Sequence, residues 1–563
     1  MKKIVCASIL TATLTACGGG GNPGTCKGSD AVCHPVAAAP ATTATSAGAG
    51  AGYTAPLQLA SASVAHQCVA PRPSGMIDPY TQQPYGDVQG SLTAEKQWIR
   101  AFVNETYLWY QDVVDLDPAL FIPGATVAYT EPSNNSERKM ALSSNFDAVN
   151  AYFNSQRSMQ TTNSGKPKDQ FHFTYRTDEW QALSNSGNSV GFGMQVALVS
   201  SAPPRKAVVA YTEPGSPAST GNVARGAQLI SVNGVAIADG DPAPLNEALF
   251  APIAGKQYNF QVLDQGSAAP RNVTLSAGNV TSTPVQNAGT LPAPYGNVGY
   301  IQFNDHIATA ESQLIAAVTT LKANNGGKGV DDLVLDLRYN GGGLLDIASE
   351  MAYMIAGPNA TASKNFETAS FNNKNPFGVN AGAGTPFHNV TQGFSTTAGQ
   401  ALPQLGLGRV FVITGNGTCS ASEAIMNGLK GAGIQVIQIG NTTCGKPYGF
   451  IPQDNCGVTY FTIQFKGVNH LGFGDYADGF IPAGTGATAN NLPGCVVPDD
   501  FTKPMGDITE ARLAAALQYR HDGTCPVPAS GYNKVAAARR DAVLGRSTLR
   551  ENRFFLPRLG APR

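Results

Sequence analysis

A serine at position 420 lies where a short apolar run passes into a segment with helical spacing. Residues 409–414 are apolar and β-branched and are bounded by glycines, which is typical of a buried strand. Residues 424–430 have helical spacing that stops at Gly431. Ser420 is therefore predicted at a helix N-terminus, where unpaired N–H groups stabilise the oxyanion that forms when a serine attacks a carbonyl. The position equally suits a serine that only caps the helix.

Two further chemical groups follow predicted strands. Three glycines at 341–343 follow one apolar run, and Lys446 follows another. A lysine can take the proton of a serine hydroxyl if burial lowers its pKa, and glycines let the backbone approach a substrate closely. The predicted strands are 298–303, 333–337, 409–414 and 435–439, and the predicted helices are 309–323, 344–355 and 510–519. Such alternation predicts a parallel sheet whose site gathers beyond the carboxyl ends of the strands.

Two other residues offer competing chemistry. His306 follows the predicted strand 298–303 and could replace Lys446 as the base, as in Ser–His proteases. Residues 187–191 fit the G-x-S-x-G pattern of esterases, with Ser189 as the nucleophile. That pattern requires a strand before the serine and a helix after it, whereas polar residues precede Ser189 and a strand-like run follows. The esterase hypothesis is therefore disfavoured.

The N-terminus carries export signals. Residues 1–3 include two lysines, residues 4–14 are mostly apolar, and Cys17 follows small residues. Residues 1–17 resemble a bacterial lipoprotein signal peptide, which implies lipidation of Cys17; an ordinary secretory signal is the alternative. Gly18 after the cysteine implies an outer-membrane anchor in the bacterial cell envelope, on its periplasmic or surface face. Residues 18–90, rich in Ala, Gly, Thr, Ser and Pro, are predicted to be a flexible tether.

Charge and cysteine content narrow the function classes. The formal net charge of −1 gives no indication of nucleic-acid binding. Eight of the ten cysteines remain once Cys6 and Cys17 are set aside, and none has zinc-type spacing, so we expect disulfides and no metal. We predict the pair Cys444–Cys456 across a hairpin, with Cys419 as a competing partner for Cys444. A second predicted pair is Cys495–Cys525.

Residues 91–283 divide into two predicted domains. Residues 91–186 are predicted to form a small helical domain, with one helix over 93–114 and another over 146–156. Residues 187–283 resemble a PDZ domain, on the Gly191-Phe192-Gly193 turn and the later GSPA and ARGAQLISVNG stretches. The resemblance implies that residues 191–193 capture the C-terminal carboxylate of a peptide that adds to a sheet edge. A β module without a ligand is the alternative.

Three ordered motifs resemble those of the C-terminal processing (tail-specific) proteases, a tricorn-related family. They are DLRYNGGG at 336–343, SASE at 420–423 and GNTTCGK at 440–446. The resemblance implies that Ser420 is the nucleophile and Lys446 the general base. It also implies an α/β protease core of the ClpP/crotonase-like type over 284–530, with a tail over 531–563. Cys444 departs from the aromatic residue that the family has at this position.

The same resemblance assigns the supporting groups. The N–H groups of Gly342 and Ala421 are expected to form the oxyanion hole, with Gly343 as the alternative to Gly342. Asp336 and Arg338 are expected to brace the glycine loop. The sequence thus predicts a multidomain α/β, lipid-anchored serine endopeptidase that binds protein or peptide substrates by their C-termini and needs no cofactor. A non-catalytic PDZ scaffold is the alternative function.

Overall fold

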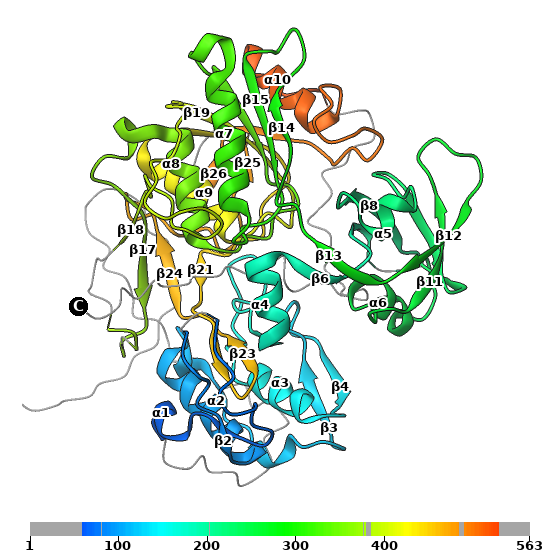
Figure 1. Ribbon diagram of the computed structural model, residues 1–563, viewed down its shortest axis with the longest axis vertical. Helices are drawn as coiled ribbons and strands as arrows, with labels where there is room; N and C mark the ends of the chain where they lie inside the picture. The colour runs from blue at the N-terminus through cyan, green and yellow to red at the C-terminus, as the bar shows by residue number, and fades with distance from the viewer. Residues whose placement is uncertain are drawn as a thin grey trace, which may run out of the picture. The chain divides into compact units, whose positions relative to one another are not determined.

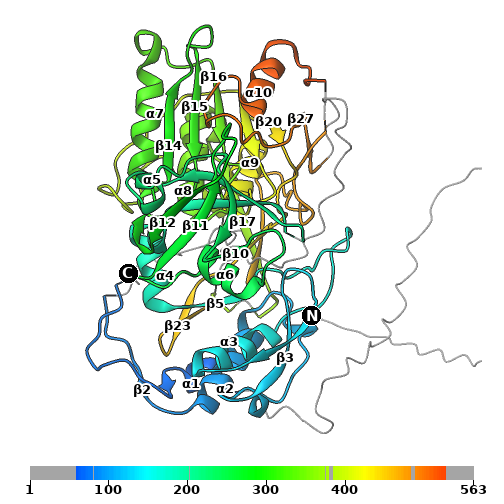
Figure 2. The same ribbon diagram turned by 90° about the vertical axis from the view of Figure 1, so that its right-hand side faces the viewer.

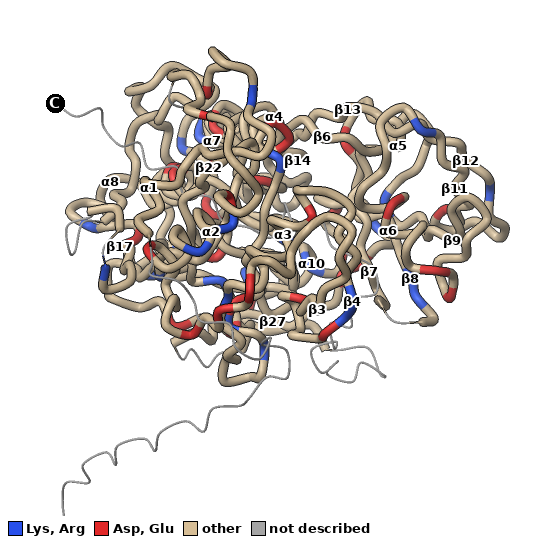
Figure 3. The backbone as a smooth tube through the Cα atoms, turned by 90° about the horizontal axis from the view of Figure 1, so that it is seen from below, with Lys and Arg blue, Asp and Glu red and all other residues tan. Residues whose placement is uncertain are grey.

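The computed structural model describes residues 59–79, 82–201, 203–374, 376–378, 384–483 and 489–527. The predicted signal peptide with Cys17, the first part of the tether and the tail 531–563 lie outside these residues. Lys and Arg residues are interspersed with Asp and Glu along the chain (Figure 3), in keeping with the near-zero net charge. Among the helices in the described ranges, none is both long and apolar enough to cross a membrane.

A six-stranded sheet forms the centre of the α/β core. Its order is β14 (Val285–Thr290), β15 (Val298–Phe303), β16 (Asp332–Asp336), β19 (Arg409–Thr414), β20 (Gln435–Gly440) and β27 (Gly494–Val496). β14 runs antiparallel to β15, and the other neighbours are parallel. The four predicted strands are therefore confirmed, and they lie side by side.

The two faces of this sheet have separate cores because side chains alternate along each strand. Leu335 and Val412 belong to a core shared with α7 (Ala310–Gly327), α8 (Leu345–Thr361) and α9 (Ala421–Ala432). Phe411 and Ile413 face the opposite way and pack with α10 (Ala511–Asp522). Figures 1 and 2 show these helices around the sheet.

Helix α9 ends two residues later than the sequence predicts. Gly431 lies inside the helix. A Cβ at this position would lie 2.8 Å from Cβ of Asn469, so the glycine serves close packing and does not end the helix. Gly433, with φ of +91°, takes the left-handed position that ends the helix.

Smaller sheets flank the core. One has the order β18 (Gly384–Pro386), β17 (Asn365–Phe371), β24 (Phe465–Val468) and β21 (Tyr448–Gly449). Another pairs β22 (Gln453–Asn455), β23 (Val458–Phe461) and β5 (Phe173–Arg176). A third pairs β25 (Ile481–Pro482) with β26 (Asn491–Leu492). The second of these sheets joins a hairpin of the core to a strand of the N-terminal region.

We call residues 59–186 the N-terminal region. Its helices are α1 (Ser61–Val64), α2 (Leu92–Thr106), η1 (Tyr110–Asp112), η2 (Pro118–Leu120), α3 (Asn145–Ser155) and α4 (Thr177–Ser186). Its strands besides β5 are β1 (Gln67–Cys68), β2 (Val88–Gln89), β3 (Thr126–Thr130) and β4 (Glu137–Ala141). The predicted helix over 93–114 is wrong beyond Thr106, because the Leu108 N–H donates to the Ile463 carbonyl and draws the chain onto the core.

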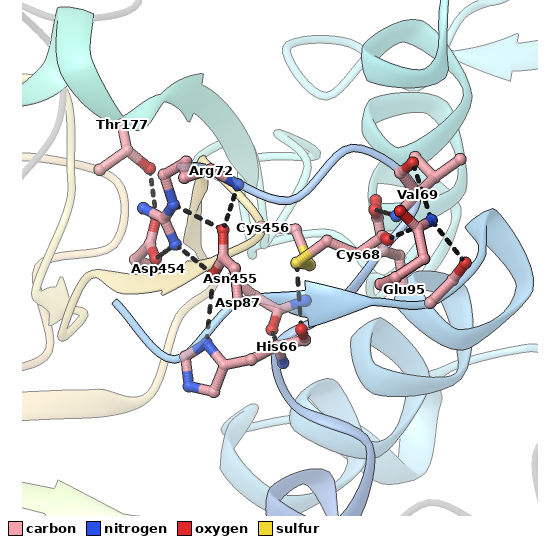
Figure 4. Close-up of a disulfide and its surroundings, with 12 residues drawn as sticks. His66, Cys68, Val69, Arg72, Asp87, Glu95, Thr177, Asp454, Asn455 and Cys456 are labelled. Atoms are coloured by element: carbon pink, nitrogen blue, oxygen red, sulfur yellow. Dashed lines mark hydrogen bonds and ion pairs between the residues drawn. A yellow bond between two sulfur atoms is a disulfide. The ribbon is translucent and has the colours of Figure 1, made fainter. Parts of the chain in front are cut away.

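The prediction of a flexible tether is wrong for the described part of residues 59–90. Cys68 forms a disulfide with Cys456, at the tip of the β22–β23 hairpin. The Arg72 guanidinium bridges the Asp87 and Asp454 carboxylates (Figure 4). The disulfide and the ion pairs hold this segment in place, although its polar composition predicts a flexible segment.

We call residues 188–281 the β module. Its strands are β6 (Asn188–Gly191), β7 (Met194–Ser200), β8 (Lys206–Thr212), β9 (Gln228–Val232), β10 (Val235–Ala236), β11 (Gln257–Leu263), β12 (Arg271–Ser276) and β13 (Gly278–Thr281). Its helices are α5 (Pro217–Thr220) and α6 (Pro242–Phe250). The main sheet has the order β12-β11-β9-β8-β7, with β10 beside β9. The antiparallel pair β6–β13 forms the connection to the rest of the chain (Figure 1).

Candidate active site

The three sequence motifs meet at one edge of the core sheet. They follow β16, β19 and β20, which are consecutive parallel neighbours. Their carboxyl ends lie at the same edge, as the alternating pattern predicts. Thr418, in the turn after β19, ties all three turns together: its hydroxyl donates to the Leu337 carbonyl at 2.7 Å, and its carbonyl accepts from the Cys444 N–H at 3.0 Å.

Ser420 lies at the N-cap of α9, as predicted, with a strained backbone. Its φ and ψ are +66° and −118°, a conformation rarely adopted by residues other than glycine. The preceding residue is held in place because the Cys419 N–H donates to the Asn340 carbonyl at 3.2 Å. Ser420 is completely buried. Strain of this kind persists only where the surroundings enforce it, and it is concentrated at functional sites.

The glycine loop packs directly against the serine turn. A Cβ on Gly342, whose φ is +100°, would lie 2.7 Å from the Ser420 Cβ and 2.8 Å from the Ala421 nitrogen. Only glycine fits at this distance. The Gly342 N–H already donates to the Asn340 side-chain oxygen at 2.9 Å, which counts against it as an oxyanion donor. The Gly343 and Ala421 N–H groups have no acceptor among the described residues.

A buried glutamate anchors both the serine turn and the lysine turn. Glu423 Oε2 accepts from the Ser420 N–H at 2.9 Å and from the Lys446 N–H at 2.8 Å. Its other oxygen accepts from the Gly445 N–H at 2.9 Å and from the Thr443 hydroxyl. One carboxylate therefore fixes the backbone of both predicted catalytic residues. The Ser-x-x-Glu spacing is that of a capping box and accounts for the bond to Ser420, whereas the sequence gives no signal for the bond to Lys446.

Lys446 is completely buried between aromatic rings. Its Nζ lies 4.2 Å from the ring centroid of Phe450 and 4.6 Å from that of Phe171. Phe171 belongs to the N-terminal region, so a residue 275 positions earlier in the chain (446 − 171) lines the lysine. No local pattern in the sequence predicts this contact.

A buried carboxylate in the N-terminal region positions Phe171. Asp169 accepts from the Phe171 N–H at 3.0 Å and from the Tyr107 hydroxyl at 2.7 Å. Burial alone would raise the pKa of Asp169, but the hydrogen bond and charge of His172, together with the Tyr107 hydroxyl, hold the pKa below its usual range. The carboxylate is thus stabilised in its charged form.

The described disulfides are Cys68–Cys456, Cys419–Cys444 and Cys495–Cys525. The predicted pair Cys444–Cys456 is wrong because the hairpin tip carries Cys456 toward the N-terminal region, while Cys444 meets its competing partner Cys419. The pair Cys495–Cys525 is confirmed.

The sulfurs of Cys419 and Cys444 also lie within 4.8 Å of a Glu423 carboxylate oxygen, a grouping with metal-ligand chemistry. Metal binding requires thiolates, and here both sulfurs are consumed by the disulfide. The site as built does not fit a metal ion.

An ionic network braces the glycine loop from behind. The buried Arg338 donates to the Asp336, Glu510 and Asp499 carboxylates at 2.8–2.9 Å. Burial opposes ionisation of Asp499, but the charges of Arg512, Arg338 and Arg225 lower its pKa. Arg225 comes from the β module, and its guanidinium also donates to the Tyr339 hydroxyl at 2.8 Å. The β module therefore touches the motif that carries the glycine loop.

Other candidate residues lie in the β module or beside the glycine loop. Phe192 is buried in the core of the module, 5.2 Å from the Phe260 ring, and Gly193 has φ of +71°. Ser189 is exposed on β6, after a helix and before another strand, which excludes the esterase elbow. His306 lies against the glycine loop, with its Nδ1 2.9 Å from the Asn340 side-chain oxygen.

Comparison with known proteins agrees with this arrangement. Residues 297–450 match the family described as "Peptidase family S41". The chain is 28% identical over 183 residues to a carboxyl-terminal-processing protease of Picosynechococcus sp., covering 31% of this chain and 41% of the relative. It is 29% identical over 140 residues to one of Synechocystis sp., covering 24% and 31%. The chain thus spans less than half the length of these curated relatives.

A solved structure shares the fold. The crystal structure of a Bacteroides fragilis protein described as an S41 protease superposes with a TM-score of 0.53 at 21% identity, over 78% of this chain and 99% of that one. The similarity to this structure shows the fold that the chain shares with it. Residues 297–450 are thus similar to peptidase family S41, and both curated relatives are carboxyl-terminal-processing proteases.

Proposed function

We propose that this chain is a serine endopeptidase in which Ser420 attacks a peptide carbonyl and Lys446 accepts the hydroxyl proton. The observation that carries the proposal is the shared anchor: one oxygen of Glu423 accepts from the N–H groups of both residues. A structural N-cap serine needs no such link to a buried lysine 26 residues later (446 − 420). The alternative of a non-catalytic scaffold leaves this link and the strain at Ser420 unexplained.

The proposed reaction follows from the groups around Ser420. As its Oγ attacks, the hydroxyl proton passes to the Lys446 amine, and the developing oxyanion is held by the N–H groups of Ala421 and Gly343. Lys446 then returns the proton to the leaving amine, which gives an acyl-enzyme. A water molecule, deprotonated by the same amine, hydrolyses that ester. Complete burial favours the neutral amine that this step requires, because desolvation disfavours the ammonium form, and it acts against the attraction of the Phe171 and Phe450 ring faces for a cation.

The β module is proposed to be a PDZ domain that binds substrate C-termini. Among the described strands, β7 pairs with β8 alone and forms an edge of the sheet, directly after residues 191–193. An edge strand has unpaired N–H and C=O groups to which an extended peptide can add. Proteins or peptides with unstructured C-termini are the substrates that fit.

The disulfides support an extracytoplasmic location, since such bonds persist in oxidising compartments. We propose that Cys17 carries the lipid anchor to the membrane of a bacterial cell envelope, with the outer membrane as the expected site.

His306 is the competing base, and its contacts favour a supporting role. Its N–H donates to the Gly342 carbonyl, and its carbonyl accepts from the Leu344 N–H at 2.8 Å. Because the Nδ1 atom of His306 also lies 2.9 Å from the Asn340 side-chain oxygen, His306 contacts the glycine loop through both its backbone and its ring.

The test is cleavage of a denatured protein by the full chain, with products identified by mass spectrometry. Ser420→Ala should lower turnover at least roughly 1,000-fold while the protein still folds. Lys446→Arg should be as inactive, because guanidinium stays protonated in proteins. His306→Ala should keep activity within about tenfold of wild type. Equal turnover by Ser420→Ala would refute the proposal, and an active Lys446→Arg with an inactive His306→Ala would make His306 the base.

A further inference from the structure

The disulfide Cys419–Cys444 lies inside the proposed catalytic centre. Cys419 directly precedes Ser420, and Cys444 lies two residues before Lys446. Both cysteines are buried, with 0% and 5% exposure. The other described disulfides have different surroundings: one ties the β22–β23 hairpin to the N-terminal region and one ties β27 to the chain after α10. Only Cys419–Cys444, among the described bonds, connects the serine turn to the lysine turn.

This bond is the covalent member of a set of links between the two turns. The others are hydrogen bonds, from the Cys444 N–H to the Thr418 carbonyl and from the Ser420 and Lys446 N–H groups to Glu423. Hydrogen bonds exchange with water when a loop opens, whereas the disulfide limits how far the turns can separate. It joins Cα atoms 5.2 Å apart.

The strain at Ser420 gives a second reason for a covalent tie. A φ of +66° in a serine persists only if the flanking chain is held on both sides. Helix α9 holds the following side. On the preceding side, Cys419 is held by its N–H bond to the Asn340 carbonyl and by its sulfur. Its carbonyl also accepts from the Ser422 N–H at 3.1 Å, so loss of the sulfur link removes the covalent restraint on that side and leaves hydrogen bonds alone.

We propose that Cys419 and Cys444 are positioning residues, and that the Ser420–Lys446 site becomes competent only when their disulfide forms. This inference rests on the proposed peptidase function. It implies that a chain still in a reducing compartment is inactive, and that oxidation after export completes the site. In the forming step, one thiolate attacks a disulfide oxidant to give a mixed disulfide, and the other thiolate displaces it. The oxidant leaves as a dithiol, having taken up the two electrons and two protons that the cysteines lost.

The first test compares two double variants of the oxidised full chain on a peptide substrate. Cys419→Ala/Cys444→Ala should lower kcat and the rate of Ser420 labelling by a fluorophosphonate roughly 100-fold, since a displacement of about 1 Å is enough for that loss. KM should stay within about threefold, because substrate binding is not altered. The matched control Cys495→Ala/Cys525→Ala removes a disulfide outside the site and should change kcat less than about threefold.

A second measurement applies if the first variant does not fold. The variant Cys68→Ala/Cys456→Ala/Cys495→Ala/Cys525→Ala keeps Cys419–Cys444 as its only described disulfide. This variant is purified in the reduced state and treated with glutathione disulfide. Its activity should rise in step with the loss of the Cys419 and Cys444 thiols, which mass spectrometry maps.

A reduced chain as active as the oxidised one would overturn the inference, as would full activity of Cys419→Ala/Cys444→Ala. An oxidised wild type without Ser420-dependent cleavage would instead refute the peptidase proposal on which the inference rests.

Discussion

The N-terminal region and the β module meet the same α/β core in opposite ways. The N-terminal region shares its hydrophobic core with the sheet: Phe102 and Tyr152 belong to one continuous cluster with Leu335 and Val412. The β module has a cluster of its own, built around Phe192 and Phe260. It meets the core through the β6–β13 pair, the Arg225 bonds and a small cluster around Tyr211 and Met505.

This difference separates the part of the chain that builds the proposed catalytic site from a part that is attached to it. The N-terminal region supplies Phe171 against Lys446, pairs β5 with β23 and is crosslinked through Cys68–Cys456. The β module contacts the site indirectly: its Arg225 donates to the Tyr339 hydroxyl, which lies behind the glycine loop. We therefore expect the N-terminal region and the α/β core to unfold as one catalytic body, and the β module to unfold separately.

The largest expected effect comes from a matched pair of buried phenylalanines. Phe171→Ala should destabilise the catalytic body by about 3–5 kcal/mol and lower kcat, because it removes core packing and one ring beside Lys446. Phe192→Ala should destabilise only the β module by a similar amount, about 3–5 kcal/mol. Differential scanning calorimetry of the full chain should show two transitions, each variant shifting a different one. A single transition shifted equally by both variants would mean that the two parts unfold together.

A smaller effect concerns pH and is confined to the catalytic body. Burial, and next the nearby Glu311 carboxylate, raise the pKa of Glu350 to about 9. Between its ordinary pKa and this value the folded chain keeps a proton that the unfolded chain releases, so stability falls as pH rises, by up to about 1.4 kcal/mol per pH unit. Glu350→Gln retains a neutral, hydrogen-bonding side chain and should remove this slope between pH 6 and pH 9.

The control for this prediction is Glu247→Gln in the β module. Glu247 is paired with Lys256, whose hydrogen bond lowers the pKa of the carboxyl group, so it does not titrate in the same range. Urea unfolding at several pH values measures both variants. A wild-type slope that survives in Glu350→Gln would assign the pH dependence to another group.

The smallest effect on catalysis should follow removal of the β module. Gly191 and Gly278 are opposite partners in the β6–β13 pair, so a two-residue Asn-Gly turn can replace residues 192–277 and close a hairpin. The shortened chain should label at Ser420 within about threefold of the wild-type rate, because the contact that it loses, between Arg225 and Tyr339, lies behind the glycine loop. It should lose any preference for substrates with a free C-terminus over the same peptides amidated. A complete loss of labelling would show that the module is needed to form the site.

Local patterns in the sequence predicted the parts of the site that depend on local structure. Each of the strands 409–414 and 435–439 is apolar and ends at a motif, so the meeting of Ser420 and Lys446 at one sheet edge followed from topology. No local pattern predicts that Cys68 pairs with Cys456, across 388 residues. The same holds for the contact of Phe171 with Lys446, because both depend on how distant segments pack.

The hydrogen bond of the Gly342 N–H shows the same limit at short range. Asn340 and Gly342 are two residues apart, yet the bond between the Asn340 side chain and the Gly342 N–H depends on loop geometry that spacing does not specify.

The central claim is that Ser420 is a nucleophile activated by Lys446 within a body built jointly by the N-terminal region and the core. Its most direct test is peptide mapping by mass spectrometry after the full chain reacts with a fluorophosphonate. We expect a single adduct, on Ser420, that forms at least roughly 100-fold more slowly in Lys446→Arg. An adduct on Ser189 or another serine, or labelling of Ser420 in Lys446→Arg at the wild-type rate, would contradict it.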